Sequence, residues 1–180
     1  MEPKELMTKR RIENLASEYE KYKLPKTNIN LDDRSKIDVF VSHSSADKKF
    51  ITKVLLFLKF AKGGISGYVD WQDPAMQHPT NAETAVLLKD RIKRAEKIIY
   101  VVTNDSLKSV WCSWELGFAD RDKGIENIAL LAIRPNNGYW KNNEYLDEYP
   151  WITYEDSLFK VNMPKGHSMS LYEWLNRKFI

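Results

Sequence analysis

The chain has 180 residues, a length that fits one domain able to bury a core of its own. The composition is that of a globular protein, with 43% hydrophobic and 12% aromatic residues, and the single cysteine, Cys112, excludes an intrachain disulfide and a multi-cysteine zinc site. The net charge of +3, from 28 basic and 25 acidic side chains, is too small to indicate a nucleic-acid partner.

The hydropathy pattern contains no segment long enough to span a membrane. The longest apolar runs, residues 98–102 and 128–133, fall far short of the ~20 residues that a membrane helix needs. No apolar stretch follows the charged residues at the start of the chain, so the sequence predicts no signal peptide. We therefore expect a soluble, cytoplasmic protein without a membrane partner.

Residues 1–35 are predicted to form an N-terminal helix and a linker. Residues 4–23 are rich in Lys and Glu and carry a narrow apolar stripe at helical spacing, which indicates an amphipathic helix. The stripe consists of Ile12, Leu15, Ala16 and Tyr19. Such a helix packs either on its own domain or on a partner, and the sequence leaves both possibilities open. Residues 24–35 are polar and contain Pro25, which is typical of a linker.

The rest of the chain alternates short apolar strands with amphipathic helices. Strands are predicted at residues 37–42, 67–71, 97–103, 125–133 and 151–154. The helices between them are predicted to begin near residues 44, 80 and 109, and a last helix is predicted at 170–179. This alternation is typical of an α/β domain, in which helices cover both faces of a parallel sheet.

A five-stranded parallel sheet suits the flavodoxin-like order 2-1-3-4-5. We assign residues 36–155 to this domain and residues 156–180 to a C-terminal extension whose helix packs on it. In this order the topological switch point lies between the first and third strands, where ligands bind. Ligands are therefore expected beside residues 42–47 and 104–109.

The helix that starts at the switch point carries the most informative stretch, residues 109–116, which read SVWCSWEL. Helical spacing places Trp111, Cys112 and Glu115 on one face. A carboxylate among aromatic groups is partly desolvated, which tends to raise its pKa and is typical of functional sites. The alternative interpretation is that the aromatic residues belong to the core and that Glu115 only stabilises the helix start electrostatically.

The loop after the first strand is a second candidate for ligand binding. It contains Ser42, His43, Ser44 and Ser45. Three hydroxyls and an imidazole at a helix N-terminus favour phosphate oxygens, although simple helix capping explains the same residues. Asp70 and Trp71 end the second strand on the same side of the sheet.

Other chemical motifs are absent from the sequence. It contains no P-loop, no glycine-rich dinucleotide fingerprint and no nucleophile elbow of a hydrolase. The three histidines have no metal-ligand spacing. We therefore expect neither a metal site nor a bound cofactor.

Three segments together resemble the Toll/interleukin-1 receptor (TIR) domain family. Residues 38–47 (DVFVSHSSAD) resemble its opening motif, residues 68–71 (YVDW) its second strand in bacterial members, and residues 109–116 its S-x-W-C-x-x-E-L segment. The segments come in the family's order and cover roughly residues 36–155. In size the chain is similar to stand-alone bacterial members, such as the TIR subunits of Thoeris anti-phage systems.

The resemblance implies a flavodoxin-like fold and one of two functions. Some members are adaptors that bind other TIR domains, whereas others cleave NAD+ at the nicotinamide–ribose bond with the glutamate of the third segment, here Glu115. Several stand-alone bacterial members make a cyclic or conjugated ADP-ribose signal, which implies a separate effector protein that senses it. For this chain the resemblance implies NAD+ as substrate rather than cofactor, and self-association in which the loop at 72–79 completes a neighbour's site.

On this interpretation the other candidate residues bind the substrate. They are Ser42, His43, Ser44, Ser45, Asp70, Trp71, Trp111 and Cys112, with the indoles stacking on a ring of NAD+ and the serine loop binding phosphate or ribose. Two alternatives remain open, a non-catalytic TIR adaptor and a domain that binds a nucleotide without turnover. The sequence does not determine which product forms.

Overall fold

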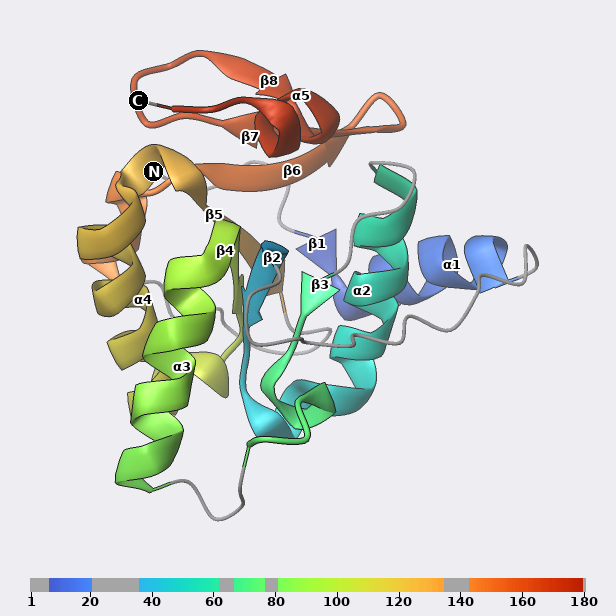
Figure 1. Cartoon of the computed structure of the whole chain (residues 1–180). Coiled ribbons are helices and arrows are strands. Elements are labelled where there is room, and N and C mark those ends of the chain that lie inside the picture. Colours follow the sequence, from blue (N-terminus) through green and yellow to red (C-terminus); the bar gives the residue numbers. More distant parts are fainter. Residues whose placement is uncertain (1–6, 21–35, 62–66, 77–80, 135–142, 180) are drawn as a thin grey trace.

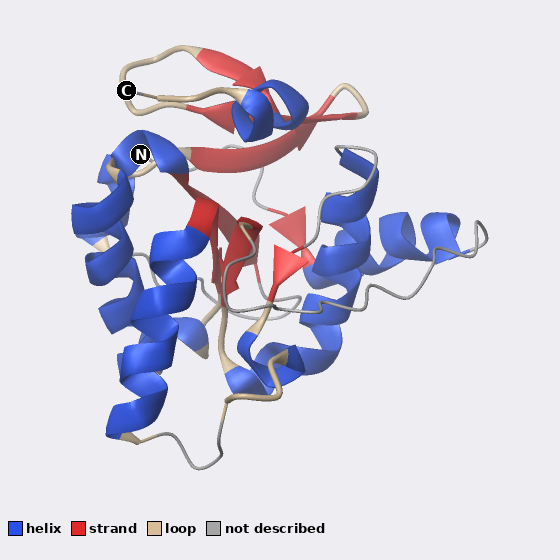
Figure 2. Cartoon of the chain, viewed as in Figure 1, coloured by secondary structure: helices blue, strands red, loops and turns tan. Residues whose placement is uncertain are grey.

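A computed structural model describes residues 7–20, 36–61, 67–76, 81–134 and 143–179. A sheet runs through the middle of the molecule with helices on both sides (Figure 2). The linker predicted at residues 24–35 and the part of the predicted loop at residues 77–79 lie outside the described residues.

Within the described residues the sheet has eight strands, of which five form a parallel centre. The centre follows the order β3-β2-β4-β5-β6, and each neighbouring pair is parallel. These strands are β2 (Ile37–Ser42), β3 (Gly67–Tyr68), β4 (Ala95–Val102), β5 (Ile128–Arg134) and β6 (Trp151–Glu155). The antiparallel strands β7 (Leu158–Asn162) and β8 (Ser168–Ser170) extend one edge, and β1 (Met7–Thr8) pairs in parallel with the end of β5.

The sheet is thus larger than the five-stranded, entirely parallel sheet that we predicted, because the described residues add β1 and the antiparallel strands β7 and β8. The β6–β7 hairpin turns at Asp156 and Ser157, whose φ values of 52° and 63° are left-handed. Sequence analysis missed this turn because neither position is a glycine. The boundary drawn at residue 155 falls inside this hairpin. Helix α5 (Leu171–Asn176) is shorter than the helix predicted at 170–179, because residue 170 still belongs to β8 and the backbone of Arg177 is extended.

The helices cover the sheet in two groups (Figure 1). Helices α1 (Lys9–Glu20) and α2 (Lys48–Ala61) lie on one side, and α3 (Ala82–Arg94) and α4 (Val110–Lys123) lie on the other. Short 3-10 turns lie among them at Ser45–Asp47, Asp70–Gln72, Ser106–Lys108, Ile125–Asn127 and Glu144–Glu148. Among the described residues, no helix has the length and apolar content to cross a membrane.

The core is divided between the two faces of the sheet because strand side chains alternate. Val39 and Val41 of β2 point into the core under α1 and α2, whereas Phe40 points into the core under α3 and α4. The same alternation continues in β4 and β5. This alternation decides which helix each residue at the end of β2 meets.

The N-terminal helix packs on its own domain. Ile12 and Ala16 of α1 are fully buried, and Ile12 lies in the same core as α2 together with Met7 of β1. Since β1 also pairs with β5, the segment 7–20 is continuous with the sheet and the core. At the other end of the chain, α5 is fixed by the buried Trp174, whose Nε1 donates to the Glu126 carbonyl at 2.8 Å.

Candidate active site

The carboxyl ends of the central strands bring Ser42 and Glu115 together. Ser42 is the last residue of β2 and follows Phe40 on the face that α4 covers. The Ser109 hydroxyl caps α4 by accepting from the Cys112 N–H at 3.3 Å, and Glu115 lies in the second turn of this helix. The Ser42 Oγ donates to the Glu115 Oε2 at 2.5 Å.

Glu115 is a buried carboxyl group with a strongly altered acidity. The residue is only 8% exposed, and burial raises the pKa of its carboxyl to about 8. The Ser42 hydroxyl opposes this rise because it donates to the ionised form, and the charge of Asp70 adds to it. Within the described part of the chain, the groups that set this pKa include no lysine or arginine. The protein thus holds a carboxyl group that changes charge close to neutral pH.

Cys112 lies beside this pair with its thiol buried. The residue is 1% exposed, and burial, followed by the charge of Glu115, raises the pKa of its thiol to about 12. A thiol that stays protonated is a poor nucleophile and a poor metal ligand. In the part of the chain that the structure describes, no group of His, Cys, Asp and Glu side chains has the arrangement of a metal site.

His43 points to the other face of the sheet, toward Trp71. Its Nδ1 lies 2.9 Å from the Val41 carbonyl, and its ring meets the Trp71 indole edge-on with centroids 4.5 Å apart. Its Nε2 lies 3.6 Å from Asp70 Oδ1. Burial lowers the pKa of His43 despite the opposing effects of the Val41 carbonyl and Asp70. A neutral ring that donates from Nδ1 keeps a lone pair on Nε2 at the site.

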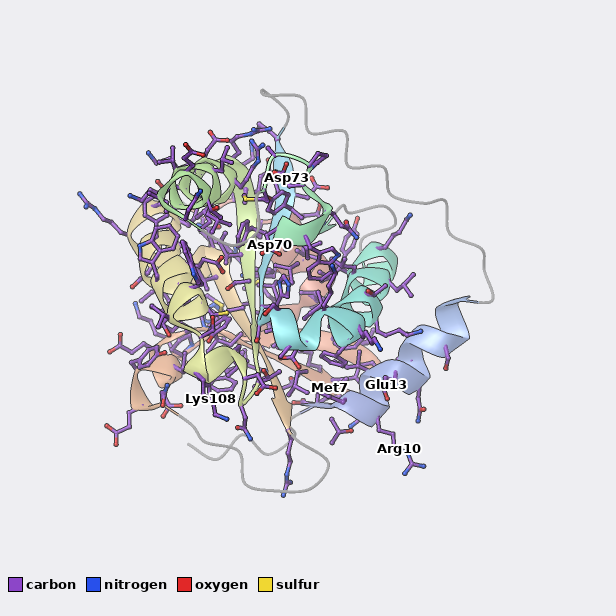
Figure 3. The ribbon with its side chains drawn as sticks, turned by 90° about the horizontal axis from the view of Figure 1, so that it is seen from below. Met7, Arg10, Glu13, Asp70, Asp73 and Lys108 are labelled. Carbon is purple, nitrogen blue, oxygen red and sulfur yellow. The ribbon has the colours of Figure 1, made fainter. Side chains whose placement is uncertain are left out.

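Asp70 joins the two sides of the site. Its charge acts on His43, on Cys112 and on Glu115, and Figure 3, a view from below, shows it near the middle of the molecule with Asp73 on the same loop. The prediction of a strand to residue 71 was wrong, because β3 ends at Tyr68. The Asp70 carboxylate accepts from the Trp71 N–H at 2.8 Å, and this local bond replaces a strand partner.

The remaining candidates are less closely associated with Glu115. Ser44 caps the 3-10 turn by accepting from the Ala46 N–H at 3.3 Å, whereas Ser45 is exposed. Trp111 is half-buried and meets Trp114 edge-on with centroids 5.6 Å apart, on the side of the core that α3 and α4 share. Trp114 in turn stacks on Phe118. Trp111, Trp114 and Phe118 are thus all half-buried and pack against the core under α3 and α4, and substrate binding by Trp111, Ser44 and Ser45 stays a prediction.

Sequence analysis missed a buried ion pair that anchors the loop after β3. The Arg91 Nε donates to the Asp73 Oδ2 at 2.8 Å, and the Tyr68 hydroxyl donates to the same oxygen at 2.9 Å. Both charged side chains are at most 4% exposed. Helical spacing offered a signal, because Arg91 lies on the buried face of α3 together with Leu88. These bonds fix Tyr68 and Asp73, and Asp70 and Trp71 lie between them in the chain.

Comparison with known proteins identifies the family of this chain. The family model of the TIR domain matches residues 39–161. A protein of Bacillus cereus (strain MSX-D12) described as a probable 3' cyclic ADP-D-ribose synthase ThsB' is 32% identical over 126 residues, which is 67% of this chain and 63% of that protein. A protein of Cytobacillus dafuensis described as a putative cyclic ADP-D-ribose synthase TIR2 is 36% identical over 93 residues, which is 50% of this chain and 24% of that protein.

Among solved structures, the TIR domain of the Toll-related receptor TRR-2 from Hydra magnipapillata is similar with a TM-score of 0.46 and 20% identity. The match covers 62% of this chain and 79% of that one. The chain thus spans less than two thirds of the two curated relatives, at 63% and 24% of their lengths. The family model covers well over half of the sequence, and the chain belongs to the TIR domain family.

Proposed function

We propose that this protein cleaves NAD+ at the nicotinamide–ribose bond and releases nicotinamide together with a cyclic or conjugated ADP-ribose signal. The observation that carries the proposal is the buried Glu115 carboxyl, which Ser42 orients and whose pKa burial raises to about 8. The printed descriptions of two relatives as cyclic ADP-D-ribose synthases support it.

Cleavage of the nicotinamide–ribose bond depends on an oriented carboxylate rather than on a proton donor. Nicotinamide is cationic in NAD+ and leaves as a neutral molecule, so the leaving group requires no proton. The ribose becomes oxocarbenium-like as the bond breaks, and the negative charge of Glu115 stabilises it. Ser42 fixes one carboxylate oxygen, so the carboxylate does not have to reorient during the reaction.

NAD+ supplies the opposite charge that Glu115 lacks. The positive nicotinamide ring favours the ionised carboxylate, so binding of NAD+ lowers the pKa of Glu115 below its value of about 8 in the free protein. Without substrate the carboxyl group is protonated in a large fraction of molecules at neutral pH. The substrate thus brings Glu115 into its reactive form.

The substrate is placed by the groups around this carboxylate. Trp71 and Trp111 offer indole faces for a ring of NAD+, with His43 and Asp70 beside the first of them. The hydroxyls of Ser44 and Ser45 precede α2 and bind ribose or phosphate. Cyclisation outcompetes hydrolysis when a nucleophile of the same molecule lies close and water is excluded.

The signalling role requires partners outside this chain. We propose that TIR domains self-associate, with the loop at 72–79 contributing to a neighbour's site, and that a separate effector senses the product in bacterial anti-phage defence. NAD+ is the substrate, and the reaction uses no other cofactor, no metal and no nucleic acid. We place the reaction in the cytoplasm, where NAD+ is available.

The test is nicotinamide release by purified protein, measured at low and at high protein concentration with and without a crowding agent. The Glu115→Gln variant is expected to lose activity by about a thousandfold or more, because the stabilising charge is gone. Glu83→Gln, which changes an exposed carboxylate on α3, is the matched control and should behave as wild type. A wild-type protein inactive in every condition would contradict the enzymatic proposal and favour the adaptor.

A further inference from the structure

An N-terminal arm, residues 7–20, precedes the segment that matches the family model, and an ion pair joins this arm to the loop after β2. The Lys9 Nζ lies 2.7 Å from the Asp47 Oδ1. The Asp47 side chain is 1% exposed, whereas the Lys9 side chain is 37% exposed. A charge as deeply buried as Asp47 needs a partner, and α1 supplies it from a distant part of the sequence.

Asp47 connects the two loops that flank the switch point. It closes the loop that begins at Ser42, and its second oxygen, Oδ2, accepts from the Thr103 hydroxyl at 2.6 Å. Thr103 follows β4 and exchanges hydrogen bonds with Ser106, from the Thr103 N–H to the Ser106 Oγ at 2.8 Å and from the Ser106 N–H to the Thr103 Oγ1 at 3.0 Å. One carboxylate thus joins Lys9, the loop after β2 and the loop after β4.

The N-terminal arm is fixed on the domain, so the Lys9–Asp47 contact has a defined geometry. Met7 pairs with Ile133 at the carboxyl end of β5, and Met7 and Ile12 are each 1% exposed. The Lys9 ammonium also lies 5.5 Å from the centre of the Phe50 ring of α2. Figure 3 shows Met7 and α1 next to α2. Strand pairing and core packing on either side of Lys9 therefore fix its position.

We propose that Lys9 is a positioning residue of the active site, and that it holds the substrate-binding loops after β2 and β4 in place through Asp47. This inference rests on the proposed function, because those loops bind the substrate only if NAD+ occupies the site. Lys9 does not touch the reacting atoms. Its loss therefore affects substrate binding more than the chemical step.

The test compares two substitutions of Lys9 with one of its exposed neighbour Arg10. Lys9→Met keeps the aliphatic stem and removes the charge, Lys9→Arg keeps the charge, and Arg10→Met is the matched control. The KM for NAD+ is expected to rise about tenfold in Lys9→Met, with a smaller change in kcat, because loop placement is disturbed. Lys9→Arg should restore most of the loss and Arg10→Met should equal wild type. A Lys9→Met enzyme with wild-type KM overturns the proposal.

A second readout does not depend on activity. The charged groups that act on His43 are Asp70, Asp47 and Lys48, so removing the cation beside Asp47 should raise the pKa of His43. NMR titration of the His43 ring measures this shift in the absence of NAD+. If wild type releases no nicotinamide, the proposed function fails while this titration still tests whether Lys9 acts on the loop. An unchanged His43 titration in Lys9→Met overturns the inference.

The Lys9→Met variant leaves the buried Asp47 carboxylate without its cation, which destabilises the whole protein. A second variant separates this loss of stability from a loss of loop placement. The double variant Lys9→Met with Asp47→Asn removes both charges and avoids that penalty. It should fold, as measured by its thermal transition, and still show a raised KM because the connection to the arm is absent. A folded double variant with wild-type KM would show that the ion pair only balances charge, and the proposal would fail.

Discussion

Two buried carboxyl groups at the same end of the sheet, Glu115 and Asp73, have opposite surroundings. Asp73 receives the Arg91 guanidinium and the Tyr68 hydroxyl, and these bonds hold the pKa of its carboxyl below the usual range although burial acts in the other direction. Among the described groups that act on Glu115, only the Ser42 hydroxyl lowers the pKa of the carboxyl. Burial raises this pKa to about 8.

The difference separates a structural carboxylate from a reactive one. A carboxylate with a full set of donors gains nothing from a cationic ligand, because its charge is already compensated. A buried carboxylate without a cation gains a great deal from one, since the ligand removes the cost of burying the charge. The contrast predicts that substitutions at the two sites change stability in opposite directions.

The largest effect on stability is expected from Arg91→Met. This change leaves Asp73 buried without its cation, which should lower the free energy of unfolding by about 3–5 kcal/mol. Chemical denaturation at pH 7 measures the loss. Arg121→Met, at an exposed position on α4, is the control and should cost far less. An equal cost in both variants would contradict the assignment of Asp73 and Arg91 as the anchor of the loop.

Glu115→Gln is expected to stabilise the protein, and to do so only above a certain pH. The carboxyl pKa is about 8 in the folded protein against 4.5 as the reference, so the unfolded chain loses its proton first and stability falls as pH rises from 4.5 to 8. Glutamine does not titrate. Its advantage should be absent near pH 4 and approach about 5 kcal/mol at pH 9, since one pKa unit corresponds to about 1.4 kcal/mol.

Denaturation curves of wild type and Glu115→Gln over this pH range measure the difference. Asp73→Asn should show the opposite trend, because the lowered pKa of Asp73 gives stability that is present above the reference pKa and is lost in acid. If the two variants have the same pH dependence, the contrast between the two carboxyl groups is wrong.

Ser42→Ala is expected to shift the pH dependence of catalysis. The Ser42 hydroxyl stabilises the ionised form of Glu115, so its removal raises the pKa of that carboxyl further. The ascending limb of kcat/KM, which reports the free enzyme, should move about 0.5–1 pH unit toward alkaline values. Ser113→Ala, on the exposed side of the same helix, provides the comparison. An unchanged limb would show that Glu115 is not the titrating group.

The smallest expected effect concerns the β6–β7 turn, which lies outside the surroundings of Glu115 and Asp73. Ser157 has a φ of 63° in the β6–β7 turn, a conformation that glycine adopts without strain. Ser157→Gly should raise the free energy of unfolding by about 0.5–1 kcal/mol without affecting catalysis. Thermal unfolding and nicotinamide release check both parts. Ser113→Gly, inside α4, should instead be destabilising, and a loss of stability in both would contradict the turn assignment.

Much of the fold is visible in the amino-acid pattern. The apolar runs that form β2, β4 and β5 are continuous because both faces of these strands are buried. The segment at 109–116 placed Glu115 one turn into a helix at the switch point and marked the family. Strand β7 escaped prediction because the β6–β7 turn, at Asp156 and Ser157, lacks the usual glycine.

The amino-acid pattern therefore specifies the kind of domain and the residue types at the carboxyl edge of its sheet. Which of these residues meet depends on how the elements pack. Ser42 and Glu115 are 73 residues apart, and Lys9 and Asp47 are 38 residues apart, so no local pattern pairs them. Periodicity tells which face a side chain takes. The depth of burial and the partner across the interface, which set the pKa of Glu115, depend on how whole elements pack against each other.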